Sequence, residues 1–340
     1  MERGEFTYHE MITQPSSWAA ALEILKSQHS DIVSVWRKGY TQVLFTGCGS
    51  TYYLALAAAA LLQELTGIPA RGLPASELWL YPQACYPRNG RVLLIAVSRS
   101  GETTETLRAC QAFKEGQYGE LLTLSCYPDM PLAQMGDFNL VLPSGQEQSV
   151  AQTRAFSTLY LACAGLASFW SGLGTEVFNG LPEAGDKIIE AANSTVKTLG
   201  EDSSLDRFYF LGSGPRYGLA CEISLKMKEM SLSHSEPFHV PEFRHGPISM
   251  VTPGSLVVGL LSEANRAVET AVLKDARALG GRTLTIGEGS ADLNFTSGLQ
   301  EAFRNVLYLP VGQLLAFARS LAKGLNPDCP NNLDSVVKLA

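Results

Sequence analysis

Three hydroxyl side chains and a glycine lie within six residues of one another in the stretch Ser98-Arg99-Ser100-Gly101-Glu102-Thr103. An apolar run precedes the stretch and apolar residues at helical spacing follow it, which predicts a strand, a turn and a helix that begins near Glu102. Free amides at a helix N-terminus favour an anion, and glycine lets the backbone approach closely. One hydroxyl would be an ordinary cap. Three exceed what capping needs, so these residues, called the phosphate turn below, predict a bound phosphate.

A second group of reactive side chains comes later in the chain. Glu222, Lys226 and Glu229 are spaced i, i+4 and i+7, which puts them on one face of a predicted helix. A solvated stripe with an ordinary ion pair is the alternative interpretation. The intervening residues are largely apolar, however, and a carboxylate beside a lysine in a partly apolar cleft can be tuned toward a general base.

Histidines follow this helix. His245 precedes Gly-Pro and is therefore expected in a turn, where an imidazole could shuttle protons near neutral pH. A lone histidine of this kind is more often a surface or structural residue. His234, His239 and His245 could also be considered as metal ligands, but their spacings of five and six match no common zinc pattern. We predict no metal and no other cofactor.

The elements that position these groups are strands alternating with helices, which indicates an α/β sheet of parallel strands. The pattern then repeats. Residues 45–55 can be laid on residues 210–220 at an offset of 165, and six of eleven positions coincide in the same strand–turn–helix context, which favours a tandem repeat. The same offset lays the phosphate turn on residues 263–268, where no serine, threonine or glycine occurs. The sequence therefore predicts one composite site for the two repeats.

The expected organisation has five parts. They are an N-terminal arm and helix at 1–35, a first domain at 36–175, a linker and helix at 176–200, a second domain at 201–330, and a tail at 331–340. Within them we expect an arm over 1–18, one helix over 18–36 and another over 150–170.

Composition narrows the class of protein. The 340 residues are 46% hydrophobic and 17% charged, which indicates two globular domains. With 26 basic and 33 acidic residues and no dense basic run, nucleic acid is not an expected partner. Seven scattered cysteines without a CxxC pair favour free thiols in a reducing compartment. No signal peptide or membrane-length apolar segment is recognised, so we expect a soluble cytoplasmic protein without a membrane partner.

Taken together, the motifs resemble those of double sugar-isomerase (SIS) domain proteins, in particular the isomerase half of glucosamine-6-phosphate synthase and free-standing relatives of the glucosamine-6-phosphate deaminase type. They are GCGST at 47–51, SRSGET at 98–103, VAQTRAF at 150–156, LGSG at 211–214, EISLKMKEMSLSHSE at 222–236, EFRHGP at 242–247 and NPDCPNNL at 326–333. The resemblance covers nearly the whole chain in order. It implies two flavodoxin-like subdomains, each a mostly parallel sheet flanked by helices, in a homodimer with the site near the subunit interface.

The resemblance also implies roles for individual residues. A phospho-sugar would be held at its phosphate by Ser98, Ser100, Thr103, Ser50 and Thr51, and its sugar would be lined by Cys48, Gly49, Val150, Ala151 and Gln152. The synthase usually has serine where this chain has Gln152. Glu229 would move a proton between C1 and C2, supported by Glu222 and Lys226. His245 would assist ring opening, often from the neighbouring subunit.

Two departures from the synthase affect the expected reaction. The synthase lysine that forms an imine with the ketose is replaced by Ser335, and the nearest lysine is Lys338. Either Lys338 substitutes through a shifted tail, or imine chemistry with the ketose is not used. The glutaminase domain and its N-terminal cysteine are also missing from this sequence, so we do not expect it to make ammonia from glutamine by itself.

The sequence thus predicts an enzyme that converts glucosamine 6-phosphate to fructose 6-phosphate and ammonia by acid/base proton transfer. Another aldose–ketose phosphate isomerase or a fructosamine-6-phosphate deglycase is an alternative of the same shape. A non-catalytic sugar-phosphate sensor is an alternative of another class. Such a sensor needs the phosphate turn, but it does not need both Glu229 and His245.

Overall fold

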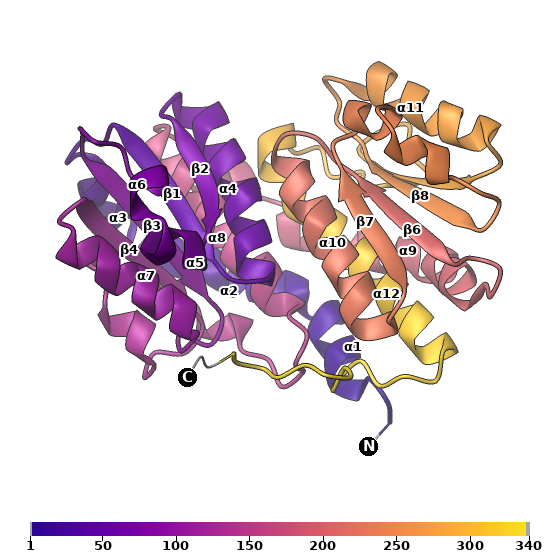
Figure 1. The fold of residues 1–340 in the computed structure, drawn as a ribbon, viewed down its shortest axis with the longest axis horizontal. Coiled ribbons are helices and arrows are strands. Elements are labelled where there is room, and N and C mark those ends of the chain that lie inside the picture. Colours follow the sequence, from indigo (N-terminus) through magenta and orange to yellow (C-terminus); the bar gives the residue numbers. More distant parts are fainter. Residues whose placement is uncertain (1, 338–340) are drawn as a thin grey trace. The chain divides into compact units, whose positions relative to one another are not determined.

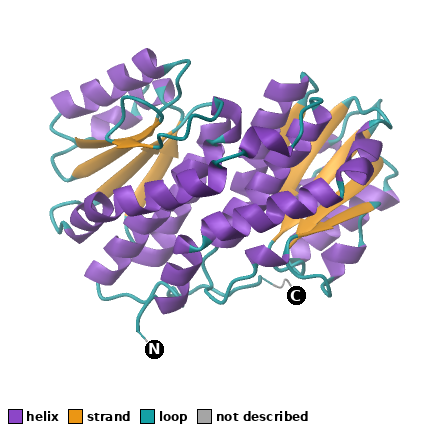
Figure 2. Ribbon diagram, turned by 180° about the vertical axis from the view of Figure 1, so that it is seen from behind, coloured by secondary structure: helices purple, strands orange, loops and turns teal. Residues whose placement is uncertain are grey.

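The computed structural model describes residues 2–337 and consists of two compact units. The N-unit comprises Ser16–Glu147, Arg154–Val177 and the tail from Asp334 onward. The C-unit comprises the residues up to Pro15, Gln148–Thr153 and Phe178–Leu333. Each unit holds one parallel five-stranded sheet with helices packed on it, as Figures 1 and 2 show. The predicted α/β class with two tandem subdomains is confirmed.

The N-unit sheet has the strand order β2-β1-β3-β4-β5. Its strands are β1 (Gln42–Gly47), β2 (Ala70–Pro74), β3 (Val92–Ser98), β4 (Gly119–Ser125) and β5 (Phe138–Val141). Every residue of β3 is buried, as its apolar sequence predicts for a strand covered on both faces. The helices are α2 (Gln14–Ser27), α3 (His29–Trp36), α4 (Ser50–Thr66), α5 (Ala75–Leu80), α6 (Pro82–Cys85), α7 (Thr104–Glu115) and α8 (Arg154–Trp170).

The C-unit sheet has the order β10-β9-β8-β6-β7. Its strands are β6 (Arg207–Leu211), β7 (His234–Phe238), β8 (Ser255–Leu260), β9 (Arg282–Gly287) and β10 (Leu293–Asn294). The helices are α1 (Glu5–Ile12), α9 (Leu181–Glu201), α10 (Pro215–Ser231), α11 (Arg266–Ala278) and α12 (Tyr308–Ala322). α12 packs against both α9 and α10.

The tandem repeat is confirmed in the geometry. α4 and α10 each have 17 residues and begin 165 positions apart. Each follows a glycine with positive φ, 55° at Gly49 and 58° at Gly214, a conformation that glycine adopts at little cost. The sequence therefore preserved both the length of this helix and the turn that opens it.

The offset of 165 does not extend to the phosphate turn, and this corrects the sequence alignment. In the first repeat, Gln42 of β1 pairs with Val92 of β3. In the second repeat, the counterpart of Gln42 is Arg207 of β6, which pairs with Ser255 of β8. The offset there is 163, because the second repeat is two residues shorter before β8. The counterpart of the phosphate turn therefore begins at residue 261 and retains a hydroxyl at Ser262, contrary to the prediction that none survives.

Other differences from the expected elements have tertiary causes. The segment expected as an arm holds helix α1 from Glu5, whose first turn is anchored by Asp328, which accepts hydrogen bonds from Thr7 N and Thr7 Oγ1 at 2.8 Å each. The single helix expected over 18–36 is divided at Gln28 into α2 and α3. The helix expected from residue 150 begins only at Arg154. Strand β7 was missed because it is charged and contains Pro237, which an edge strand tolerates.

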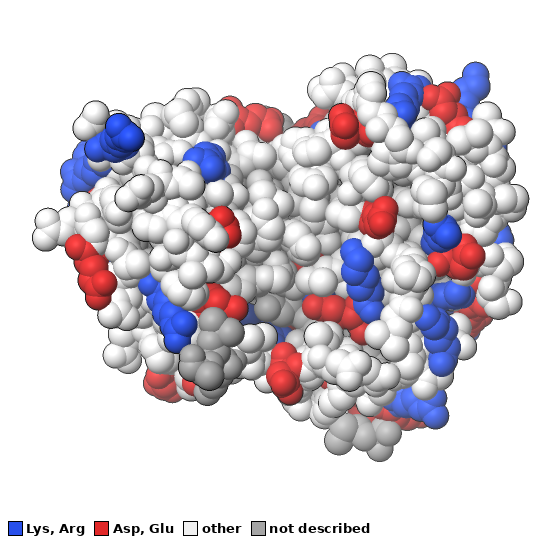
Figure 3. Space-filling model, viewed as in Figure 1, with Lys and Arg blue, Asp and Glu red and all other residues white. Residues whose placement is uncertain are grey.

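The surface is mixed in charge. On the face shown in Figure 3, Lys and Arg side chains are interspersed with Asp and Glu. Within residues 2–337, no helix combines the length and apolarity that crossing a bilayer requires.

Candidate functional site

Two helix N-termini of the N-unit converge at the carboxyl edge of its sheet. Strands β1 and β3 are neighbours there, and the connections that follow them run to opposite sides, which makes this the switch point where open α/β sheets bind ligands. The turn after β1 opens α4 at Ser50, and the phosphate turn opens α7 at Thr104, two residues later than predicted. Cys48 Sγ lies 3.5 Å from Thr106 Oγ1, which links the turn after β1 to the first turn of α7.

The hydroxyls of the phosphate turn are engaged by its own backbone. Gly101 N donates to Ser98 Oγ at 3.1 Å, and Glu102 N donates to Ser100 Oγ at 3.2 Å. Thr103 Oγ1 lies 3.2 Å from Ser98 Oγ. A hydroxyl that accepts from an amide keeps its own proton to donate, so a ring of such hydroxyls can bind an anion. Gly101 has φ 72°, and a Cβ there would lie 2.9 Å from Met130 Cβ, so the turn requires glycine.

The first turn of α4 supplies the neighbouring groups. Ser50 and Thr51 are buried at its start, and Thr51 Oγ1 accepts from Cys48 N at 2.9 Å. Burial raises the pKa of Cys48, so its thiol stays protonated near neutral pH and is not suited to act as a nucleophile. Cys48 and Gly49 can line a site here, but the chemistry of acid and base must come from other residues.

A buried arginine of the phosphate turn was not singled out from the sequence. Arg99 Nη1 lies 3.4 Å from Glu147 Oε2, and both side chains are nearly inaccessible. Arg99 Nη2 donates to the carbonyl oxygen of Ser335 at 2.9 Å, which holds the tail beside the phosphate turn. The tail position that is lysine in the synthase thus lies at this turn, whereas Lys338 falls outside the described residues. The sequence feature that could have identified Arg99 is the position of a cationic residue between Ser98 and Ser100.

The predicted carboxylate–lysine face is present on α10 of the C-unit, and it is not a solvated stripe. Lys226 Nζ lies 3.2 Å from Glu222 Oε1 and 2.5 Å from Glu229 Oε2. The side chains of Glu222 and Lys226 are 0% and 1% exposed, whereas that of Glu229 is 18% exposed. Glu229 is therefore the solvent-accessible end of a buried ion cluster and can meet a ligand.

The cluster holds a positive charge inside the protein. Burial alone would lower the pKa of Lys226, but Glu222 and Glu229 together outweigh it and raise that pKa above its ordinary value. Lys226 therefore remains an ammonium and fixes both carboxylates. A carboxylate fixed in this way can take and return a proton at one position of a bound substrate.

The segment 148–153 belongs to the same unit as this cluster, although it precedes the second repeat. Val150 N donates to Asp328 O at 3.0 Å, and Gln313 Nε2 donates to Thr153 O at 3.2 Å. Ala151 is buried. Gln152 Oε1 is buried and has no hydrogen-bond partner among the described residues, so it can accept one from a ligand.

The histidines are dispersed in the C-unit. His245 is exposed in the turn between two short 3₁₀ helices, as predicted, and across residues 2–337 its imidazole forms no hydrogen bond or ion pair. His239 stacks on Tyr217 with ring centroids 3.7 Å apart, and burial, only partly offset by Glu242, lowers its pKa. His234 opens β7. In the described part of the chain, no three His, Cys, Asp or Glu residues are grouped to hold a metal.

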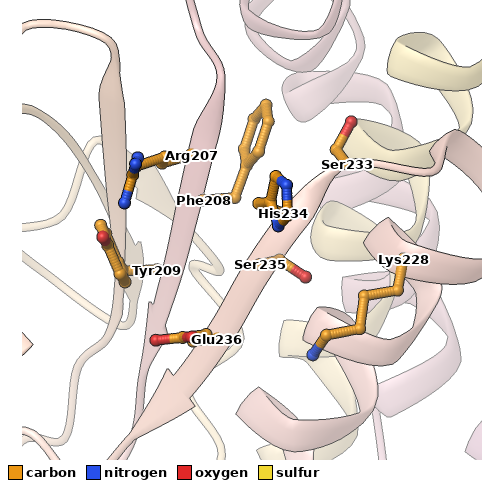
Figure 4. A pocket seen from close by; sticks show the side chains of 8 residues that line it. All are labelled: Arg207, Phe208, Tyr209, Lys228, Ser233, His234, Ser235 and Glu236. Carbon is orange, nitrogen blue, oxygen red and sulfur yellow. The ribbon is translucent and has the colours of Figure 1, made fainter.

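A cavity of about 500 Å³ also opens in the C-unit, lined by Arg207, Phe208, Tyr209, Lys228, Ser233, His234, Ser235 and Glu236 (Figure 4). Lys228 comes from α10 and its ammonium lies toward Ser235 and Glu236 of β7. Burial lowers the pKa of Lys228, although Glu236 opposes the effect. None of the predicted site residues lines this cavity.

The family model for the SIS domain matches residues 39–168 and 203–312. The chain therefore belongs to the SIS domain family, with one domain in each repeat.

Two curated relatives are longer than this chain. The sequence is 28% identical over 350 residues to the glutamine–fructose-6-phosphate aminotransferase (isomerizing) of Pyrobaculum aerophilum, an alignment that covers 98% of this chain and 57% of the relative. The corresponding protein of Sulfolobus acidocaldarius is 29% identical over 308 residues, 88% of this chain and 50% of the relative. The chain thus spans about half the length of these relatives.

Two solved structures share the fold over at least 95% of their length. Glucosamine-6-phosphate deaminase of Thermotoga maritima superposes with a TM-score of 0.81 at 28% identity, covering 94% of this chain and 100% of that one. Tagatose-6-phosphate ketose/aldose isomerase of Escherichia coli gives a TM-score of 0.85 at 22% identity, covering 96% and 95%. The second likeness concerns the fold alone.

Proposed function

We propose that the protein is a hexosamine-6-phosphate deaminase/isomerase that converts glucosamine 6-phosphate and water to fructose 6-phosphate and ammonia. The observation that carries the proposal is the ion cluster of α10, in which a buried lysine fixes the accessible carboxylate of Glu229. Binding alone does not require such a cluster, because the cost of removing these charges from water can exceed what their ion pairs contribute to stability. The deaminase of Thermotoga maritima supports the choice, since it is matched over its whole length.

In the proposed reaction, the phosphate turn holds the 6-phosphate with Ser50 and Thr51. His245 moves the proton that opens the ring. Glu229 removes the proton from C2 of the open aldose and returns it to C1, while a second proton passes from the amine to O1, so that C1 becomes a hydroxymethyl group and C2 an imine. Water adds to that imine and ammonia departs, so that C2 becomes the ketone of fructose 6-phosphate. Each step needs a placed acid or base, which these side chains supply.

Gln152 and His245 add two points to the proposal, a contact with the sugar and a role for a partner subunit. Gln152 Oε1, which has no hydrogen-bond partner within residues 2–337, would accept one from a hydroxyl or the ammonium of the sugar. We propose that the protein acts as a homodimer in which His245 serves the partner subunit, because its imidazole is exposed and forms no hydrogen bond or ion pair among the described residues.

A substrate panel tests the assignment. Glucosamine 6-phosphate, fructosamine 6-phosphate and a non-amino aldose 6-phosphate are each incubated with the protein, and ammonia and ketose phosphate are measured. We expect ammonia and fructose 6-phosphate from the first alone. Turnover of the second would identify a deglycase, turnover of the third an aldose–ketose isomerase, and binding without turnover of any of them a sensor.

The phosphate contacts proposed for this turn lead to a separate prediction for KM. Ser100→Ala and Thr103→Val should each raise KM for glucosamine 6-phosphate about 10-fold or more, because one hydrogen bond to a charged group contributes about 1.5–3 kcal/mol. kcat should change little, since the contact is present in ground and transition states alike. Steady-state kinetics measures both constants.

Thr66→Val is the matched control, because Thr66 Oγ1 donates to Leu62 O at the opposite end of α4. It should leave KM unchanged. If KM is also unchanged in both phosphate-turn variants, the phosphate is not bound there.

A further inference from the structure

The second repeat has its own counterpart of the phosphate turn, residues 261–265 between β8 and α11, called the second-repeat turn below. The strand pairing that fixes the offset of 163 makes Glu263 the counterpart of Ser100 and Ala264 the counterpart of Gly101. The turn lies at the carboxyl edge of its sheet, where β6 and β8 are neighbours, which is again the switch point. Its position in the fold is therefore that of an anion site.

An anion occupies this turn, and it comes from the chain itself. Glu263 N and Ala264 N both donate to Glu301 Oε2, at 3.0 and 3.3 Å. The other carboxylate oxygen, Oε1, accepts from Arg216 Nη1 at 2.6 Å. Arg216 is the counterpart of Thr51 at the offset of 165, so the turn amides and the first turn of α10 hold one carboxylate together. Both oxygens of Glu301 are thus bound by the groups that would bind a phosphate.

The arginine is what distinguishes this arrangement from ordinary helix capping. Arg216 is only 6% exposed, and its Nε has no hydrogen-bond partner among the described residues. A buried guanidinium is costly unless an anion accompanies it. Its five donors suit a phosphate at least as well as a carboxylate. Glu301 is the more exposed partner, with 25% of its side chain accessible, so solvent and solutes can reach this ion pair from the Glu301 side.

We propose that the second-repeat turn is an anion-binding site that Glu301 fills from within the chain, and that it binds inorganic phosphate or a phosphate monoester when this carboxylate is removed or displaced. The fold thus retains two anion sites. One is open to substrate, and the other is occupied by a side chain that has the charge of the missing ligand. The inference does not depend on the reaction proposed above, because it concerns other residues and another ligand-binding event.

Inorganic phosphate is the probe for the test. Isothermal titration of the full chain compares the unsubstituted protein with Glu301→Ala and with Glu301→Ala/Arg216→Ala. We expect Glu301→Ala to bind one more phosphate per chain than the unsubstituted protein, and the double variant to lose that additional site. All three proteins retain the phosphate turn, so its occupancy cancels in the comparison.

Two outcomes would overturn the proposal: an unchanged number of phosphates in Glu301→Ala, or an additional site that persists in the double variant. Glu301→Gln replaces Glu301→Ala if the latter does not fold, because it removes only the charge. Phosphate should then protect the amide of Ala264 from hydrogen exchange in Glu301→Gln and not in the unsubstituted protein. Equal protection in the two would also refute the site.

Discussion

Glu229→Gln is expected to lower kcat for ammonia release from glucosamine 6-phosphate by about 10³-fold, within the range of about 10²–10⁴ that a positioned general base contributes. The amide keeps the shape of the side chain but cannot take the proton from C2. KM should change little, because the proposed phosphate contacts come from other residues. Initial rates of ammonia release, with the thermal stability of each protein as a check on folding, give the result.

Glu236→Gln serves as the control for Glu229→Gln. Glu236 is an exposed glutamate on β7 of the same unit. The Glu236→Gln variant should therefore retain full activity. Equal rates for Glu229→Gln and the unsubstituted protein would remove Glu229 from the reaction. Equal losses in both variants would show that the effect is general and not specific to the base.

Lys226→Met is expected to destabilise the C-unit by about 3–5 kcal/mol, because removing one partner of a buried ion pair leaves an uncompensated charge. Glu222, whose side chain is fully buried, is that charge. Hydrogen exchange along α10 measures the loss as reduced protection. The four tryptophans all lie in the N-unit, so their fluorescence reports separately on the other half of the chain.

The double variant Glu222→Leu/Lys226→Met provides the control for this prediction. Removing both charges should restore much of the protection, since apolar side chains of similar volume can replace a buried pair. Protection as low in the double variant as in Lys226→Met would mean that lost packing, and not the uncompensated carboxylate, causes the effect. Unchanged protection in Lys226→Met would contradict the cluster itself.

The pH dependence of the same pair follows from the raised pKa of Lys226. A cation whose pKa is higher in the folded state stabilises that state fully below its unfolded value, which is 10.5. The contribution is lost as the pH rises through the folded value. The stability difference between the unsubstituted protein and Glu222→Leu/Lys226→Met, which holds neither charge, should therefore stay constant from neutral pH to about 10 and change only above it.

The features that could be predicted from the sequence are those encoded locally. Strand β3 is a continuous apolar run, and the phosphate turn follows it directly. Both could therefore be predicted from neighbouring residues. The face of α10 follows from helical spacing alone. The repeat was detectable because the turn that opens α4 and α10 keeps its glycines.

The features that could not be predicted depend on partners far apart in the chain. Arg99 meets the carbonyl of Ser335 across 236 positions, and Arg216 meets Glu301 across 85. No local sequence pattern indicates either pair. The alignment of the second-repeat turn failed for a different reason: two residues are missing before β8, and only strand pairing shows where the register changes.

Glucosamine 6-phosphate carrying deuterium at C2 offers a single measurement of both the reaction and the proton transfer. After incubation with the unsubstituted protein, mass spectrometry and an ammonia assay should find equimolar fructose 6-phosphate and ammonia, with the deuterium at C1 or released to water. Glu229→Gln should leave the substrate unchanged over the same time. Recovery of glucosamine 6-phosphate with deuterium still at C2 after incubation with the unsubstituted protein would show that this chain does not carry out the proton transfer proposed for it.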